Sequence, residues 1–86
     1  MSKVIKPTGY MPLSHVVQTE DGNLYMVRST DTMDRGRETM VFPWNKRRNE
    51  VQDWDDLYYE RYKSDSDMYA GHNRICENLE AYLEEE

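Results

Sequence analysis

The sequence predicts an α+β domain in which a small antiparallel β-sheet of three or four strands packs against one C-terminal amphipathic helix. Short β-prone runs separated by turn residues fill positions 13–44. Apolar residues recur at helical spacing over positions 65–84. The whole chain, residues 1–86, has the length of a single domain with a small core.

Two segments are predicted to lack regular structure. Residues 1–12 contain Pro7, Gly9 and Pro12, so we expect an irregular lead-in. Residues 45–52 are predicted to be a basic loop with three adjacent cations. Such a cluster could hold phosphate, but without interleaved aromatic residues a solvated turn is its commoner use.

Residues 13–44 are typical of a three-stranded β-meander. Asp21-Gly22 lies between two β-prone runs and predicts a hairpin turn in which both central residues have positive φ. We expect the third strand to stop at Pro43, which cannot donate to a ladder. Alternation in the second strand separates Leu24, Met26 and Arg28 from Tyr25 and Val27.

Residues 53–64, DWDDLYYERYKS, fit either a strand or a helix. Their tyrosine content and short length favour a strand. A strand separates Leu57, Tyr59 and Arg61 from Tyr58, Glu60 and Tyr62, whereas a helix gathers Trp54, Leu57, Tyr58 and Arg61.

A helix is predicted over residues 65–84. Ser64 and Asp67 fit a capping box at its start. Gly71 lowers helix propensity by roughly 1 kcal/mol relative to alanine, which indicates close packing against the sheet. The acidic end of the chain, residues 84–86, opposes the helix dipole and should fray. The apolar stripe comprises Met68, His72, Ile75, Cys76, Leu79, Tyr82 and Leu83.

Composition points to a soluble protein of the cytoplasm. The single cysteine excludes an internal disulfide and fits a reducing compartment. The N-terminus lacks the apolar run of a signal peptide, and no segment approaches the roughly 20 apolar residues of a membrane span.

Charge is distributed unevenly along the chain. Residues 1–50 carry eight basic and six acidic side chains, whereas residues 51–86 carry three basic and eleven acidic ones. The acidic half disfavours direct binding of nucleic acid and favours a protein partner with a basic surface. The alternative is that a net charge of −6 only keeps the protein soluble.

His72 and Cys76 lie four residues apart on the predicted helix and could share a metal ion, with His15 or a carboxylate completing the site. Because the two residues lie on the apolar stripe, core packing is the favoured interpretation. We therefore predict no metal and no cofactor.

The sequence shows no catalytic constellation, and we predict that the protein is not an enzyme. Asp53, Asp55 and Asp56 are neighbours only in sequence, and neither a nucleophile elbow nor a glycine-rich phosphate loop is present.

Aromatic residues are numerous for so short a chain, with seven tyrosines and two tryptophans. Tyrosine and tryptophan are enriched where proteins meet partners, although core packing uses the same side chains. The candidate protein-binding residues are Asp53, Trp54, Asp55, Asp56, Tyr58 and Glu60.

Residues 37–83 contain the motifs ETMVFP, Asp53-Trp54 followed by a leucine, Arg61-Tyr62 and Gly71-His72. In these motifs the segment resembles small proteins encoded by bacteriophages and prophages. The resemblance implies a phage or prophage origin, hence the cytoplasm of a host cell, and supplies no catalytic residue.

Arg61, Ser64, Gly71 and His72 are expected to form a join between strand and helix. Arg61 would reach a helix carboxylate, Ser64 would cap the helix, Gly71 would permit close approach and His72 would add a hydrogen bond.

These features predict a non-enzymatic phage accessory protein that binds a host or phage protein through an acidic, aromatic surface. Inhibition of a nucleic-acid-processing or defence enzyme is one form of this function. The alternatives are a self-assembling scaffold component, which would form a homo-oligomer, and a small-ligand binder that uses His72.

Overall fold

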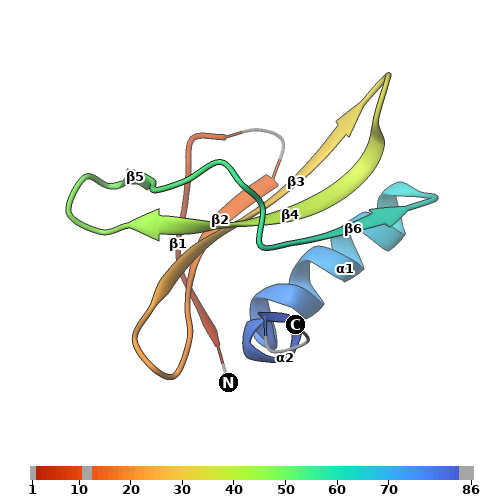
Figure 1. The fold of residues 1–86 in the computed structure, drawn as a ribbon. Helices are drawn as coiled ribbons and strands as arrows, with labels where there is room; N and C mark the ends of the chain where they lie inside the picture. The colour runs from red at the N-terminus through yellow and green to blue at the C-terminus, as the bar shows by residue number, and fades with distance from the viewer. Residues whose placement is uncertain (1, 11–12, 84–86) are drawn as a thin grey trace.

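A computed structural model describes residues 2–10 and 13–83 of the chain. It contains six strands followed by two helices (Figure 1). The elements are β1 (Lys3–Pro7), β2 (Leu13–Gln18), β3 (Leu24–Thr32), β4 (Gly36–Asn45), β5 (Glu50–Val51), β6 (Tyr58–Tyr62), α1 (Asp65–Glu77) and α2 (Leu79–Leu83). No helix in these described ranges is long and apolar enough to span a membrane.

The predicted α+β architecture is confirmed at the level of an antiparallel sheet packed against a C-terminal helix. The sheet is larger than expected, with six strands instead of three or four. Strands β1 to β5 follow one another in order, and β6 also pairs with β4. One edge of β4 therefore meets β3, while the other edge meets first β6 and then β5.

Strand β1 corrects the prediction of an irregular lead-in over residues 1–12, of which residues 1, 11 and 12 lie outside the described part. Lys3–Pro7 pairs antiparallel with β2, and the register shifts between Val4 and Lys6. Most of β1 is exposed, so it carries no alternation of apolar and polar residues that could have revealed it.

Strand β5 lies in the predicted basic loop, and its two residues pair with Trp44 and Asn45. A strand this short leaves no periodicity in the sequence. The basic residues of the loop lie in the turn at positions 46–49, where Asn49 has a φ of 54°.

Strand β4 continues through Pro43, contrary to the expected stop. The Pro43 carbonyl accepts a hydrogen bond from the amide of Gln52. In an antiparallel strand the N–H and C=O of one residue point to the same side. The ring nitrogen of Pro43, which has no hydrogen to donate, therefore points to the same edge of β4 as its carbonyl, between the segments that pair with β6 and β5. The ladder between β3 and β4 is therefore unaffected, and Pro43 still lies opposite Tyr25.

The predicted turn at Asp21-Gly22 is present but is longer than a two-residue turn. Gln18 pairs with Leu24, and the Thr19 amide donates to the Asn23 carbonyl across a five-residue loop at positions 19–23. Gly22 has a φ of 91°, whereas Asp21 is not in a positive-φ conformation. The expectation of two positive φ angles is therefore wrong.

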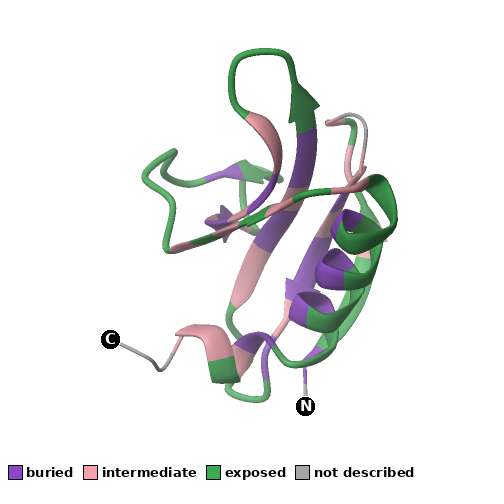
Figure 2. Cartoon of the chain, turned by 90° about the vertical axis from the view of Figure 1, so that its right-hand side faces the viewer, coloured by how far each residue is buried: buried purple, intermediate pink, exposed green. Residues whose placement is uncertain are grey.

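The sheet carries a hydrophobic core on each face. Helix α1 covers one face and turns its buried side toward the strands (Figure 2). The core of this face is Val17, Val27, Val41, Ile75, Cys76 and Leu79. The core of the opposite face is Val16, Met26, Phe42, Trp44 and Val51, with Tyr10, Leu24 and Met40 packed against it. The alternation expected along β3, and the same alternation along β4, thus assign each apolar side chain to one of the two cores.

The predicted continuous helix over residues 65–84 is divided at Asn78, whose φ of −133° ends α1. Residue 84 and the acidic end predicted to fray lie outside the described residues. Ser2 bridges the break, because its hydroxyl donates to the Cys76 carbonyl and accepts from the Leu79 amide. The division turns α2 so that Leu79 is buried and Tyr82 packs against the core.

Ser64 is the N-cap of α1, and its side chain accepts a hydrogen bond from the Asp67 amide at 3.1 Å. Replacing Ser64 by alanine should lower the free energy of unfolding by about 1 kcal/mol, because this amide loses its partner. Urea unfolding measures the change. A Ser64→Asp variant keeps an acceptor and should retain the stability, so equal losses in both variants would contradict the capping role.

Candidate functional site

A chain of hydrogen-bonded side chains runs between the sheet and α1. His15 Nδ1 lies 2.9 Å from His72 Nε2, and His72 Nδ1 lies 2.7 Å from the Ser29 hydroxyl. Ser29 and Thr39, opposite each other on β3 and β4, are joined at 2.6 Å. The Tyr62 hydroxyl donates to Thr39 at 2.9 Å. Four strands of the sheet, β2, β3, β4 and β6, are therefore tied to α1 through one polar chain.

The environment of this chain shifts the pKa values of its members. Burial, and to a smaller extent the neighbouring His15 ring, lower the pKa of His72 from 6.5 to about 4. Burial also raises the pKa of the Tyr62 hydroxyl above its ordinary value. Burial, and secondarily Glu77, raise the pKa of Cys76 to about 12. At neutral pH the side chains of His72, Tyr62 and Cys76 are therefore uncharged.

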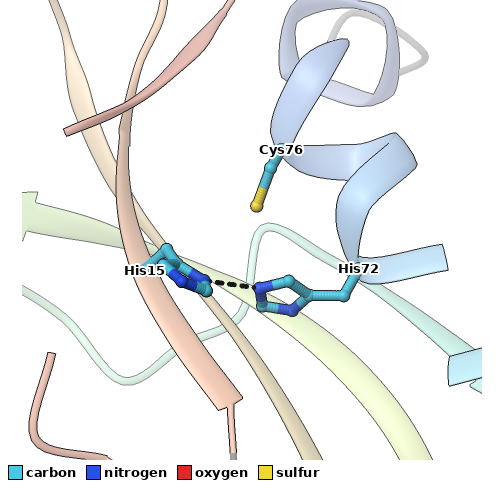
Figure 3. A group of neighbouring side chains, drawn as sticks. All are labelled: His15, His72 and Cys76. Carbon is cyan, nitrogen blue, oxygen red and sulfur yellow. Dashed lines mark hydrogen bonds between the residues drawn. The ribbon is translucent and has the colours of Figure 1, made fainter. Parts of the chain in front are cut away.

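Cys76 lies one helical turn beyond His72 and points toward the same place (Figure 3). One ring nitrogen of His15, one ring nitrogen of His72 and Cys76 Sγ all lie within 4.8 Å of one another. His72 and Cys76 are buried, and His15 is half-buried on β2. The sequence identified the helical pair and named His15 as a possible further ligand, and the tertiary structure brings His15 to that pair.

Gly71 faces β6 at the join between strand and helix. A Cβ atom at this position would lie 2.4 to 2.6 Å from the ring and hydroxyl of Tyr62, which is too close for any real contact. The close approach expected from the glycine therefore occurs, and Tyr62 is the side chain that requires it.

The ion pairs at this join differ from the expected ones. Arg61 lies on the face opposite the helix, where its Nε is 3.7 Å from the buried Glu38, so the expected link to a helix carboxylate is wrong. Instead Arg37 pairs with Asp65 at 2.6 Å, and Arg74 pairs with Glu60. Alternation along β6 explains the difference, since Glu60 and Arg61 necessarily point to opposite faces.

The candidate protein-binding residues fall into two groups. Tyr58 is half-buried, and its ring packs on Tyr82 at 5.0 Å between centroids. Its hydroxyl donates to Glu60, which in turn pairs with Arg74. Tyr58 and Glu60 therefore belong to the join between sheet and helix, whereas Trp54 contacts Phe42 on the opposite face of the sheet.

The strand predicted over residues 53–64 is shorter than expected, because β6 spans only Tyr58–Tyr62. The other four candidates therefore lie in an exposed loop before β6. Asp53, Trp54, Asp55 and Asp56 are all exposed, and the Asp55 amide donates to the Asp53 carboxylate at 3.0 Å. We call residues 53–56 the acidic loop.

Two exposed apolar side chains next to the acidic loop were missed as site residues. Leu57 is 43% exposed and Tyr59 is 57% exposed. Tyr59 pairs with Met40, so it lies on the sheet face opposite the helix. The Leu57 amide donates to the Val41 carbonyl, which extends the pairing by one residue. The alternation of side chains along a strand could have revealed this difference in the sequence, because it places Tyr59 and Tyr58 on opposite faces of β6.

Family models, curated proteins and solved structures offer no match to this chain. The fold and the two groups of side chains therefore define the protein only as an α+β domain with an exposed acidic, aromatic loop and a buried polar cluster.

Proposed function

We propose that this chain is a non-enzymatic accessory protein of a phage or prophage that binds a basic surface of a partner protein. The contact surface is the acidic loop together with Leu57 and Tyr59. The motifs within residues 37–83 that resemble phage and prophage proteins support the origin. A basic nucleic-acid channel of a host enzyme has the complementary charge and is the partner class that we favour.

The position of Trp54 is the observation that carries this proposal. Its side chain is 53% exposed, although it makes edge contacts with Tyr10 and Phe42 at centroid distances of 5.6 and 5.1 Å. These contacts orient the ring before a partner arrives, so binding loses little side-chain entropy. Tryptophans presented in this way are common binding hot spots.

The carboxylates of the acidic loop give the surface its electrostatic character. Asp53, Asp55 and Asp56 surround Trp54 in sequence and are exposed. Exposed charges act mainly on the association rate, because they steer a partner of opposite charge toward the surface. The aromatic ring, which is desolvated on contact, acts mainly on the dissociation rate.

Reversing two of these charges should slow association. We expect the Asp55→Lys/Asp56→Lys variant to bind its partner at least about tenfold more slowly at low salt. The partner is first identified by mass spectrometry of proteins that the tagged chain retains from host lysate at low salt and loses at high salt. Association rates are then measured with the purified partner by surface plasmon resonance.

An Asp34→Lys/Glu77→Lys variant is the matched control, because it makes the same charge change at two exposed positions outside the acidic loop. It should bind almost as fast as the wild type. Equal slowing in both double variants would show that net charge alone matters, and an unchanged rate in the Asp55/Asp56 variant would contradict the proposal.

Removing the ring should shorten the lifetime of the complex. We expect Trp54→Ala to weaken binding by about 2 kcal/mol, roughly 30-fold, mainly through faster dissociation. Tyr69→Ala, on the outer face of α1 and 50% exposed, removes another exposed ring and should leave binding unchanged. Dissociation from the immobilised partner measures both, and an unchanged rate for Trp54→Ala would contradict the role of the ring.

Self-assembly is the second candidate function, and the edge strand β1 favours it. Val4 is 49% exposed and Ile5 is 46% exposed on β1, which among the described residues pairs only with β2. Unprotected apolar edges can pair with a second chain. Sedimentation of the wild type and of a Val4→Lys/Ile5→Lys variant tests this, because only an edge-paired assembly would be dissociated by the substitutions.

A further inference from the structure

Three ligand-forming atoms converge between β2 and α1 at a spacing close to that of a metal site. In a tetrahedral zinc site the nitrogen atoms lie about 3.3 Å apart, and nitrogen and sulfur about 3.6 Å apart. Here the two nitrogens are separated by 2.9 Å, and no pair that includes Cys76 Sγ exceeds 4.8 Å. Displacements on the order of 1 Å would therefore create three-point coordination.

The backbone holds these three residues on rigid elements. His72 and Cys76 are four positions apart on α1, which places both side chains on the face that packs against the sheet. His15 comes from β2, where it pairs with Val27 in the interior of the ladder. The side chains meet between strand and helix in Figure 3. Sites built on helices and strands keep their ligands in position better than sites built on loops.

His72 also has the outer partner that a metal-binding histidine needs. When Nδ1–H donates to the Ser29 hydroxyl at 2.7 Å, Nε2 keeps its lone pair and faces His15 and Cys76. Ser29 is itself held by Thr39 at 2.6 Å. Such outer hydrogen bonds fix the tautomer and the ring orientation of metal ligands.

We propose that His15 Nδ1, His72 Nε2 and Cys76 Sγ form a binding site for a zinc-class transition-metal ion. Two imidazoles and one thiolate suit Zn²⁺ and Cu⁺ and do not suit Mg²⁺ or Ca²⁺, which take oxygen ligands. The metal replaces the hydrogen bond between the two histidines, and the Cys76 thiol releases its proton to solvent as the sulfur–metal bond forms. With three protein ligands, the fourth position is left to water or to a ligand from a partner.

Titration of the chelator-treated, reduced protein with Zn²⁺ and Co²⁺ tests this site. We expect one ion per chain, and at Zn²⁺ 100-fold above the dissociation constant the unfolding equilibrium constant should fall about 100-fold. Bound Co²⁺ should show an absorption spectrum of tetrahedral type with a thiolate-to-metal charge-transfer band.

Ligand variants and a control separate this site from adventitious binding. Cys76→Ala should lose the charge-transfer band and the Zn²⁺ stabilisation, and His15→Ala should weaken binding at least tenfold. Ser64→Ala, which lowers stability through the helix cap and leaves all three ligands in place, should keep the full response. Absence of one-to-one binding, or a response that survives in both ligand variants, would overturn the proposal and leave these residues a role in packing only.

Discussion

Acidification from pH 7 to pH 4 is expected to remove about 3 kcal/mol of stability through His72 alone. The side chain is fully buried, and its pKa in the folded protein is about 4 against an ordinary value of 6.5. The unfolded chain therefore binds a proton at this ring in the pH range where the folded chain does not. Stability from this group is complete above pH 6.5 and falls as the pH decreases toward 4.

The structure explains why the folded protein does not accommodate the charge. A protonated His72 would be buried against His15, which lies 2.9 Å away, and against the neutral hydroxyl of Ser29. No carboxylate is among its hydrogen-bond partners in the described residues. A cation in such a place is stabilised neither by water nor by an opposite charge.

Urea unfolding of the metal-free protein at pH 7 and pH 4 measures this effect. A His72→Asn variant keeps a donor near the Ser29 hydroxyl and has no titrating group, so its loss between the two pH values should be about 3 kcal/mol smaller than that of the wild type. Carboxylates contribute equally to both proteins and cancel in the comparison. Equal losses in wild type and variant would show that His72 is not held neutral.

Replacing Gly71 by alanine is expected to lower the free energy of unfolding by about 1 to 3 kcal/mol. Alanine is the better helix former by roughly 1 kcal/mol, so helix propensity alone predicts the opposite sign. The added Cβ would lie 2.4 Å from Tyr62 Cε1 and 2.5 Å from its hydroxyl oxygen. Tyr62 has to move, which also breaks its hydrogen bond to Thr39.

A double-mutant cycle identifies Tyr62 as the cause. In a Tyr62→Ala background the clash is absent, so Gly71→Ala should raise stability by about 1 kcal/mol. In a Tyr62→Phe background the ring carbons remain, and the substitution should still destabilise. Urea unfolding of the three single and two double variants measures the coupling. A loss of equal size in all backgrounds would exclude Tyr62 as the obstacle.

Periodic segments of the chain could be predicted from their residues alone. The meander over residues 13–44 and the helix begun at Ser64 bury one side of each element, and burial leaves a repeat of two or of 3.6 residues in the sequence. Segments without such a repeat were missed. Strand β1 is exposed along most of its length, and β5 has only two residues.

The division of the C-terminal helix was also hidden from the sequence. Its apolar stripe continues past Asn78, so periodicity alone predicts one helix. The break depends on Ser2, which satisfies the backbone groups of Cys76 and Leu79 from the other end of the chain. The spacing of apolar residues within the helix carries no information about Ser2, which lies 77 positions before Leu79.

The sequence by itself determined the fold class, the capped amphipathic helix, the glycine of the close approach and the acidic character of the segment around Trp54. Each of these features depends on residues that are close together in the sequence, through their helix or strand propensity, their spacing or their charge. Only the tertiary structure decided that Tyr59, and not Tyr58, lies beside the acidic loop, and that His15 meets His72 and Cys76. Those outcomes depend on strand pairing and helix docking, which bring His15 to His72 across a separation of 57 positions.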